Sequence, residues 1–300
     1  MGVIATSLLI VLATLLLSGL SWLAEPLLLP RGADRGPAAG GQWERNMQPA
    51  NADAWMYPVG PVMTFLGIAL AMIVIPFDRN LIAADLEIGV FYFLVVVDFV
   101  VLGLAVGGWG ANTRNGVEVY YRATAQLVAY VIPLGLAYIG AIMMARSLST
   151  VAIVEAQQNM WFVVLQPLGF VLYLVTGLMQ ALRAPFQEPL SGHIEHGVFS
   201  SYGGWKAVCW RLSMGGLLFV VSAMGAVLFL GGWLGPVLPG SVWMLLKTFA
   251  MMALLVWSGR QVRLRSMAET LELSWKYLTP IGLVNVLVVG GLILLGVGPS

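Results

Sequence analysis

The stretch GWGANTRNGVEVYYRATAQLVAY, residues 108–130, places polar sequence between two long apolar runs. A polar or charged side chain is expensive to hold against the hydrocarbon of a membrane. Such polar density therefore indicates a functional task or a protein partner, and the apolar runs on either side indicate the kind of fold. The polar and interfacial side chains of the stretch are Trp109, Asn112, Arg114, Glu118, Arg122 and Gln126.

The composition of the whole chain shows whether it is surrounded by water or by membrane lipid. Of 300 residues, 59% are hydrophobic and 10% are charged, and the mean hydropathy of +0.88 is far above that of a water-soluble domain. Most of the chain must therefore lie in a lipid bilayer. The single cysteine, Cys209, excludes a disulfide within the chain and a cysteine-held metal or iron–sulfur site supplied by this chain alone. With only two histidines, a histidine-rich metal cage is not expected, and the net charge of +1 says nothing about nucleic acid. We predict no nucleic-acid partner.

Runs of about 20 mostly apolar residues predict the membrane-spanning helices. We predict an all-α integral membrane protein that forms one polytopic domain over residues 1–300. The first run lacks a basic start and a small-residue cleavage pattern, so it is interpreted as a span rather than a signal peptide. The eight predicted spans are roughly 2–24, 55–77, 88–108, 123–145, 154–180, 208–233, 241–259 and 278–297.

Positive charge predicts the orientation of these spans. Lys and Arg gather in the loops that follow the odd-numbered spans, whereas the opposite side holds Arg79 and Arg146. An excess of Lys and Arg marks the cytoplasmic side of a membrane, so we expect both termini on the other side. The loops predicted to be cytoplasmic are about 25–54, 109–122, 181–207 and 260–277.

Two ionisable side chains fall inside predicted spans. Asp98 lies near the middle of FYFLVVVDFVVLGL, where a carboxylate is either functional or protonated and hydrogen-bonded. Lys247 lies about one and a half turns inside GSVWMLLKTFAMMALLVW. It either snorkels to the outer interface or faces a carboxylate as a charge relay.

A second polar stretch, LRAPFQEPLSGHIEHGVFSSYGGW at 182–205, lies in a predicted cytoplasmic loop. His193 and His196 form a lone HxxH spacing without an HExxH pattern or a cysteine partner, so a solvated or partner-facing loop is favoured over a metal site. The sequence contains no Gly-rich phosphate loop, no GxSxG elbow and no dinucleotide fingerprint. We therefore predict no catalytic residues and no metal ligands in this chain.

Several short pieces of sequence, taken in order, resemble the H subunit of bacterial NADH–quinone oxidoreductase, the respiratory complex I. Each piece is weak alone, but together they cover most of the chain at the spacing of that family. The pieces are RGP at 35–37, DLEIG at 85–89, GWGANTR at 108–114, RATAQLVAY at 122–130, RAPF at 183–186, FLGGW at 229–233, Lys247, the arginine cluster at 260–265 and WKYLTPIGLVN at 275–285.

The resemblance implies a role at the junction of two arms. In that family the H subunit joins the soluble electron-transfer arm to the proton-pumping membrane arm and forms the entrance of the quinone chamber. The resemblance therefore implies a non-redox subunit in a bacterial inner membrane that binds quinone transiently and holds no other cofactor. The implied partners are other membrane subunits, soluble iron–sulfur subunits and membrane lipid. The residues assigned on this basis to the quinone path and the soluble-arm interface are Arg35, Trp109, Arg114, Arg122, Gln126, Arg183, Phe186, Arg260 and Arg265. The alternative for the arginines is ordinary positive-inside charge.

The sequence departs from the family in its carboxylates. Val131, Gln180 and Met214 stand where the family carries acidic residues, and Ser266 and Met267 stand where it carries an aspartate. Each change removes a titratable group, so we expect altered proton coupling. Either Asp98 replaces a lost carboxylate or the chain is a divergent paralogue that keeps the scaffold without this proton path, and the retained docking residues favour the second interpretation. The remaining proton-relay candidates are Asp98, Glu118, Glu188, Glu195 and Lys247.

Two other functions remain open from the sequence. The first is a membrane anchor of a hydrogenase- or formate-linked complex, in which no quinone need bind. The second is a stand-alone secondary transporter, with Asp98 and Lys247 lining a substrate path. A transporter would be active alone in liposomes, whereas a subunit of a complex would not.

Overall fold

The computed structural model of the chain describes residues 12–21, 23, 49–79, 81–187 and 202–296. Within these residues the regular structure is helical, and Asp78 and Leu81 form an isolated β-bridge. The helices are Leu12–Ser21, α2 (Met56–Ala71) with the 3-10 turn η1 (Met72–Val74), α3 (Gly89–Gly110), α4 (Arg114–Ala145), α5 (Thr150–Glu155), α6 (Phe162–Leu165), α7 (Pro167–Gln180), α9 (Gly204–Phe229), α10 (Gly240–Arg260), α11 (Met267–Leu273), the π-helical turn η4 (Ser274–Leu278) and α12 (Thr279–Leu294).

Six helices in the described residues are long and apolar enough to cross a membrane. The prediction of an all-α membrane protein is therefore confirmed, whereas the prediction of eight spans is not. Two shorter apolar helices, Leu12–Ser21 and Pro167–Gln180, lie where the first and fifth spans were expected. The six long helices are Met56–Val74, Gly89–Gly110, Arg114–Ala145, Gly204–Phe229, Gly240–Arg260 and Met267–Leu294.

The fifth predicted span, 154–180, is wrong as one continuous helix, because the chain there divides into α5, α6 and α7. The buried Gln157 side chain occupies the first break and binds backbone groups on both sides of it. Pro167 begins α7, as expected for a residue that fits the first turn of a helix and lacks an amide hydrogen. An apolar composition alone did not reveal either break.

Two helices begin earlier than the predicted spans that they contain, which start at 123 and 278. Helix α4 begins at Arg114 rather than near 123, and a helical run from Met267 continues into α12 where a loop to 277 was predicted. Thr113 caps α4 by accepting a hydrogen bond of 3.1 Å from the Gly116 backbone amide. Ser266 and Glu269 form a reciprocal capping box at the start of α11. In both places the apolar run of sequence stops at polar residues, but the helix extends through those polar residues.

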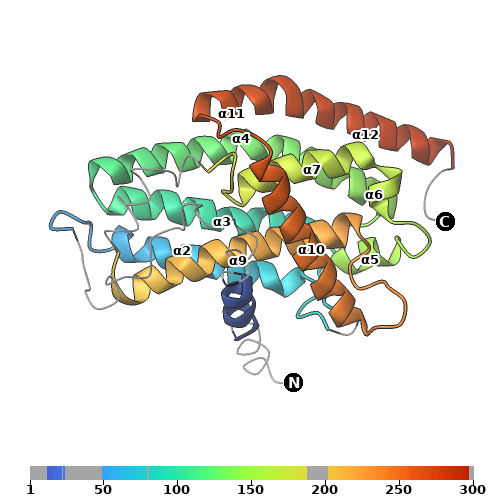
Figure 1. Ribbon diagram of the computed structural model, residues 1–300, viewed down its shortest axis with the longest axis horizontal. Coiled ribbons are helices and arrows are strands. Elements are labelled where there is room, and N and C mark those ends of the chain that lie inside the picture. The colour runs from blue at the N-terminus through green and yellow to red at the C-terminus, as the bar shows by residue number, and fades with distance from the viewer. Residues whose placement is uncertain (1–11, 22, 24–48, 80, 188–201, 297–300) are drawn as a thin grey trace.

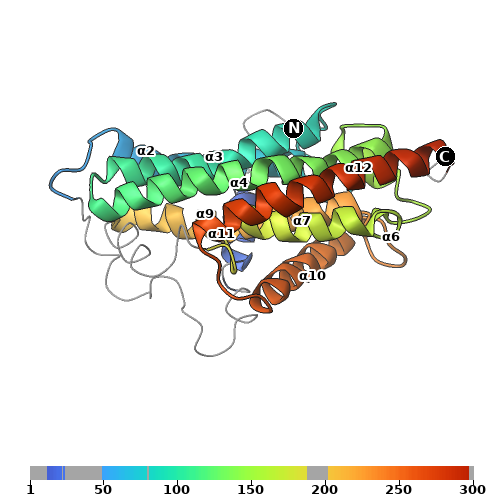
Figure 2. The same ribbon diagram turned by 90° about the horizontal axis from the view of Figure 1, so that it is seen from above.

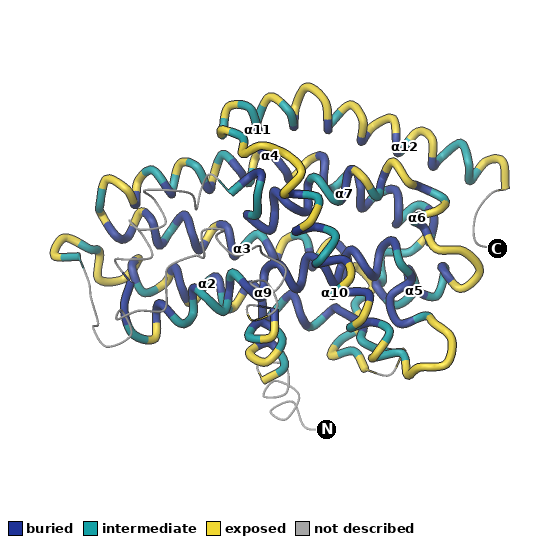
Figure 3. The backbone as a smooth tube through the Cα atoms, in the orientation of Figure 1, coloured by how far each residue is buried: buried dark blue, intermediate teal, exposed yellow. Residues whose placement is uncertain are grey.

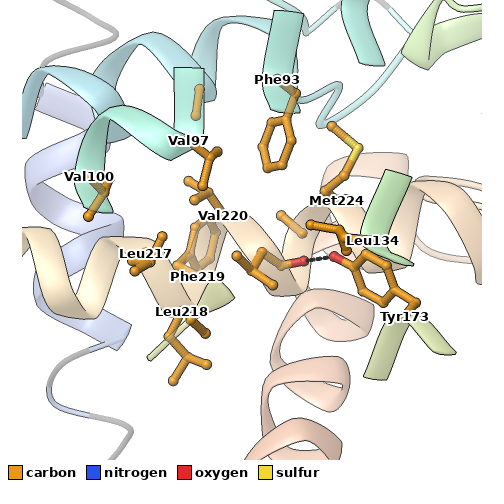
Figure 4. Packing of buried hydrophobic residues seen from close by; sticks show 14 of the residues in the cluster. Phe93, Val97, Val100, Leu134, Tyr173, Leu217, Leu218, Phe219, Val220 and Met224 are labelled. Carbon is orange, nitrogen blue, oxygen red and sulfur yellow. Dashed lines mark hydrogen bonds between the residues drawn. The ribbon is translucent and has the colours of Figure 1, made fainter. Parts of the chain in front are cut away.

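Helix α9 is the centre of the bundle, and α12 lies at its edge (Figures 1 and 2). In the most apolar window of each helix, 89% of the residues of α9 are buried but only 22% of those of Met267–Leu294. Figure 3 shows the same contrast, with α9 dark and much of α12 exposed. The core of the bundle joins α3, α4, α7 and α9, and its packing includes Phe93, Leu134, Tyr173 and Phe219 (Figure 4).

Small residues allow α2 and α3 to pack closely. A Cβ atom added to Gly60 would lie 2.5 Å from the Cα atom of Gly107, and one added to Gly103 would lie 2.7 Å from the Thr64 side chain. No real Cβ atom tolerates such distances. Membrane helices commonly associate through small residues that let two backbones approach, and this pair follows that pattern.

Candidate functional site

The turn between α3 and α4 fixes the start of the polar stretch at the surface. Asn112 adopts a left-handed backbone conformation with φ of 48°, and its side-chain amide donates a 3.0 Å hydrogen bond to the Asn51 carbonyl. Trp109, just before the turn, is 55% exposed, and Arg114, just after it, is also exposed. Both predicted interface residues are therefore accessible on the isolated chain.

The residues just before α2 are hydrogen-bonded to the same turn. The Asp53 backbone amide donates a 2.9 Å hydrogen bond to the Gly110 carbonyl. Its carboxylate accepts hydrogen bonds of 2.9 Å from the backbone amides of Trp55 and Met56. These two amides hold the pKa of Asp53 below its ordinary value, Met56 having the larger effect.

The polar stretch then winds from the surface to the interior along α4. Glu118 and Arg122, one turn apart, form an ion pair of 3.7 Å that remains partly exposed. Gln126 and Tyr130 follow at the same four-residue interval and are fully buried. The four side chains share one side of the helix, so the stretch connects the surface with the bundle interior.

Gln126 ties α4 to the segment that follows α7. Its amide nitrogen donates hydrogen bonds to the carbonyl of Met179, at 3.0 Å, and to the carbonyl of Phe186, at 3.1 Å. Phe186 is 3% exposed, so the end of the RAPF sequence is packed into the bundle. One buried amide therefore positions the described part of the predicted 181–207 loop.

Other contacts hold the RAPF segment on its remaining sides. Arg183 donates a 3.1 Å hydrogen bond from Nη2 to the Met214 carbonyl of α9. The Arg265 backbone amide donates a 3.0 Å bond to the Pro185 carbonyl. The structure thus brings together Gln126, Arg183, Phe186 and Arg265, four of the predicted interface residues, from distant parts of the sequence.

A partly buried carboxylate lies beside this segment. Asp98 of α3 accepts a 2.8 Å hydrogen bond from the Tyr130 hydroxyl of α4. The amide of Gln180, at the end of α7, lies near the same carboxylate, but outside the geometry of a regular hydrogen bond. Among the described residues, no Lys or Arg forms an ion pair with Asp98. We call the partly buried Asp98 and the fully buried Gln126, Tyr130 and Gln180 the buried polar cluster.

Lys247 lies apart from the buried polar cluster. Its ammonium group donates hydrogen bonds of 2.6 Å to the carbonyls of Leu230 and Leu234, just beyond α9, and lies 4.5 Å from the centre of the Trp161 ring. Met214, which contacts the RAPF segment, precedes Leu230 by sixteen residues, or about 24 Å of helix. Lys247 therefore satisfies carbonyl groups at the opposite end of α9, and a relay role remains a prediction.

An apolar groove of about 460 Å³ runs along the second half of α10. Arg260, another predicted interface residue, lies at its end, and the backbone beside it at Gly259 is in close contact with the Ala184 carbonyl. Gly259 is buried, whereas Ala250, Trp257 and Arg260 are exposed, so the groove lies on the outer side of α10 and the contact with Ala184 lies on its inner side. Its lining residues are Ala250, Ala253, Leu254, Val256, Trp257 and Arg260.

Some predicted site residues are not tested by this arrangement. Arg35, Glu188 and Glu195 lie outside the described residues. Within the residues that are described, no three His, Cys, Asp or Glu side chains gather as a metal site.

The sequence does not show the partner of Asp98 or the role of Gln157. Tyr130 lies four residues after Gln126, and this spacing places both on one side of a helix. Nothing in the sequence indicated that Tyr130 and Asp98, which are 32 positions apart, are hydrogen-bonded.

Comparison with known proteins gives one consistent result. Residues 43–290 match the model of a family described as NADH dehydrogenase. A protein of Geobacter metallireducens, named as an H subunit of NADH-quinone oxidoreductase, is 35% identical over 263 residues, which cover 84% of this chain and 80% of that protein. A protein of Rhodopseudomonas palustris with the same name is 34% identical over 272 residues, covering 90% of this chain and 82% of the relative. A Bacillus cereus protein, also named as an H subunit of NADH-quinone oxidoreductase, is 34% identical over 245 residues, covering 79% and 73%.

Proposed function

We propose a function for this chain, which belongs to the H subunit family of NADH–quinone oxidoreductase. On that premise, the chain is a non-redox membrane-arm subunit of a complex I-like enzyme, which anchors the soluble electron-transfer arm and lines the quinone chamber. The observation that carries the proposal is the fixed position of the RAPF segment. Gln126 and Arg265 bond to its backbone, and its own Arg183 bonds to a carbonyl of α9. A rigid loop fixed to the bundle is a suitable platform for docking a soluble subunit.

The groove along α10 supports the quinone part of the proposal. A quinone combines a long apolar tail with a ring that accepts hydrogen bonds through its two carbonyl oxygens. The groove offers an apolar wall over about two turns, from Ala250 to Trp257, with Arg260 at its end. Apolar pockets with a few polar groups that fix orientation are typical of small-molecule sites.

A photoreactive quinone tests this part directly. Crosslinking in the purified complex should label peptides from 250–260, and excess natural quinone should abolish the labelling. Arg260→Met should raise the apparent KM for quinone by about ten- to a hundredfold, as expected if a charged hydrogen bond of about 1.5–3 kcal/mol is lost. The matched variant Arg263→Met should leave the KM unchanged, because Arg263 is exposed and pairs with Glu269. Equal effects of both variants would contradict the proposed position of the quinone.

Asp98 is our proposed proton-relay residue for this chain. Among the six long apolar helices it is the only carboxylate more than two turns from either end, and its partner is the Tyr130 hydroxyl. A carboxylate at that depth is expensive unless it is used or neutralised. Because acidic residues of the family are replaced by Val131 and Gln180, we propose that coupling differs from that of the family.

Proton pumping in reconstituted liposomes tests the role of Asp98. Asp98→Asn should lower the number of protons moved per electron while leaving the rate of NADH oxidation in uncoupled membranes nearly unchanged. Tyr130→Phe keeps the carboxylate and should have the smaller effect. An undiminished proton yield in Asp98→Asn would refute the relay and favour a scaffold without a proton path. Glu118, Glu188, Glu195 and Lys247 remain weaker candidates.

Membership in a complex is tested by mass spectrometry of the proteins that co-purify after gentle extraction. Iron–sulfur subunits with other membrane subunits and an NADH-oxidising subunit are expected. Hydrogenase or formate dehydrogenase subunits instead would favour the anchor alternative, and recovery of an isolated chain active in transport would favour a transporter.

We propose that the chain lies in a bacterial inner membrane with both termini on the non-cytoplasmic side. Cysteine labelling near either terminus in intact cells would test this orientation.

A further inference from the structure

The peripheral helix α12 carries an amide in its buried stripe. Residues of η4 and α12 that are buried recur every three or four positions, as expected for one face of a helix. Most of the remaining surface of this helix is exposed, so the stripe is its main attachment to the bundle. The stripe consists of Ser274, Leu278, Gly282, Asn285 and Val289.

Asn285 meets a second buried amide at a break in the discontinuous helix. Gln166 lies between α6 and α7, and the relative exposures of Asn285 and Gln166 are 1% and 2%. Both side chains pack against Gly140 and Gly169. A Cβ atom added to Gly140 of α4 would clash with Gln166 Oε1 and lie 2.8 Å from Asn285 Nδ2. One added to Gly169 of α7 would lie 3.1 Å from Asn285 Nδ2 and 3.2 Å from Gln166 Oε1.

These two amides have enclosed polar atoms without protein partners. Gln166 Nε2, Gln166 Oε1 and Asn285 Nδ2 are inaccessible, and each has no hydrogen bond within the described residues. The two side chains face the same space yet are not bonded to one another. Buried polar groups are almost always hydrogen-bonded, and in membrane interiors the cost of an unpaired group is high. The arrangement is suited to a small ligand that both donates and accepts hydrogen bonds.

We propose that Gln166 and Asn285 bind water at the junction of α4, α7 and α12. A water molecule can donate a hydrogen bond to Gln166 Oε1 and accept one from the Asn285 amide nitrogen. The second lone pair of a water oxygen can accept a hydrogen bond from Gln166 Nε2. Buried waters typically make about three hydrogen bonds to such groups. A bound cation is disfavoured, because Asp and Glu do not contribute to the site and hard cations require six or more oxygen ligands.

The bound water has a structural consequence. It joins the peripheral helix α12 to the break between α6 and α7. The hydroxyl of Ser274, in η4 before α12, donates a hydrogen bond to the Ala129 carbonyl of α4. These two polar contacts hold α12 to α4 and α7 at points eleven residues apart, or about 16 Å of helix. The site lies outside the proposed quinone path and does not depend on it.

The decisive experiment is a density map of the intact complex at a resolution that shows ordered water. Density within about 3.2 Å of both amide groups is expected. Amides bonded directly to each other, or a space without density, would overturn the proposal.

A double-mutant cycle gives a second readout. Gln166→Leu and Asn285→Leu should each lower the thermal midpoint of the complex by about 2–4 °C, and the double variant should lose less than the sum, because both amides share one water. Additive losses would contradict a shared water. Gly140→Ala should also destabilise the complex, whereas Gly135→Ala on the same helix should not, since a Cβ atom at Gly135 would meet nothing within 4 Å.

Discussion

Replacing Gln157 by alanine is expected to loosen the discontinuous helix formed by α5, α6 and α7. The Gln157 side chain makes four hydrogen bonds in the bundle interior. Its nitrogen donates to the carbonyls of Ile153 and Val227, at 3.1 and 2.8 Å. Its oxygen accepts from the amides of Phe162 and Gly231, at 3.2 and 3.0 Å. One side chain thus links the end of α5, the start of α6 and the end of α9.

The size of the effect follows from the groups left without partners. In Gln157→Ala, the amides of Phe162 and Gly231 lose their acceptor, at a cost of about 1–3 kcal/mol each. Release of the glutamine side chain returns roughly 1–2 kcal/mol of conformational entropy. The net loss is about 1–4 kcal/mol, or roughly 2–8 °C in thermal midpoint at about 2 °C per kcal/mol for a large domain.

Thermal unfolding of the purified complex, followed by the solubility of this chain, measures the change. The neighbouring variant Gln158→Ala is the matched control, because Gln158 is exposed and its replacement should change stability by no more than about 0.5 kcal/mol. Equal midpoints for the two variants would refute the argument, since it assigns the stabilisation to the buried glutamine alone. A loss confined to Gln157→Ala would confirm that side-chain hydrogen bonds hold the break.

Three further changes test other parts of the fold. Gly60→Ala should lower stability by about 1–3 kcal/mol, because its methyl group would meet the backbone of Gly107, whereas Gly291→Ala on α12 should be neutral, and similar midpoints would contradict close α2–α3 packing. Lys247→Met should lower the thermal midpoint by removing two charged hydrogen bonds without changing proton yield, and a fall in proton yield at unchanged stability would instead favour a relay. Asp53→Ala should be less stable than wild type at neutral pH. Because the folded state depresses the pKa of Asp53, this difference should persist above the ordinary pKa of 3.8, shrink as the pH falls through the lowered value, and be absent in strong acid.

The sequence alone determined the solvent, the fold class and the family. A composition that is 59% hydrophobic cannot be solvated by water, so the all-α membrane class followed directly. Motifs such as RATAQLVAY and RAPF retained enough identity to indicate the family. These properties are local, because hydropathy and motif spacing are read along the chain.

Only the tertiary structure decided which polar residues meet. Gln126 and Phe186 are sixty residues apart, and Asp98 lies 32 residues from Tyr130, yet both pairs are hydrogen-bonded. The break at Gln157 was invisible for the same reason, since it is stabilised by carbonyl and amide groups of α9 and the turn after it rather than by its own neighbours alone. In an apolar bundle, a single amide or carboxylate must find its partner on another helix, and sequence spacing does not show which helix supplies it.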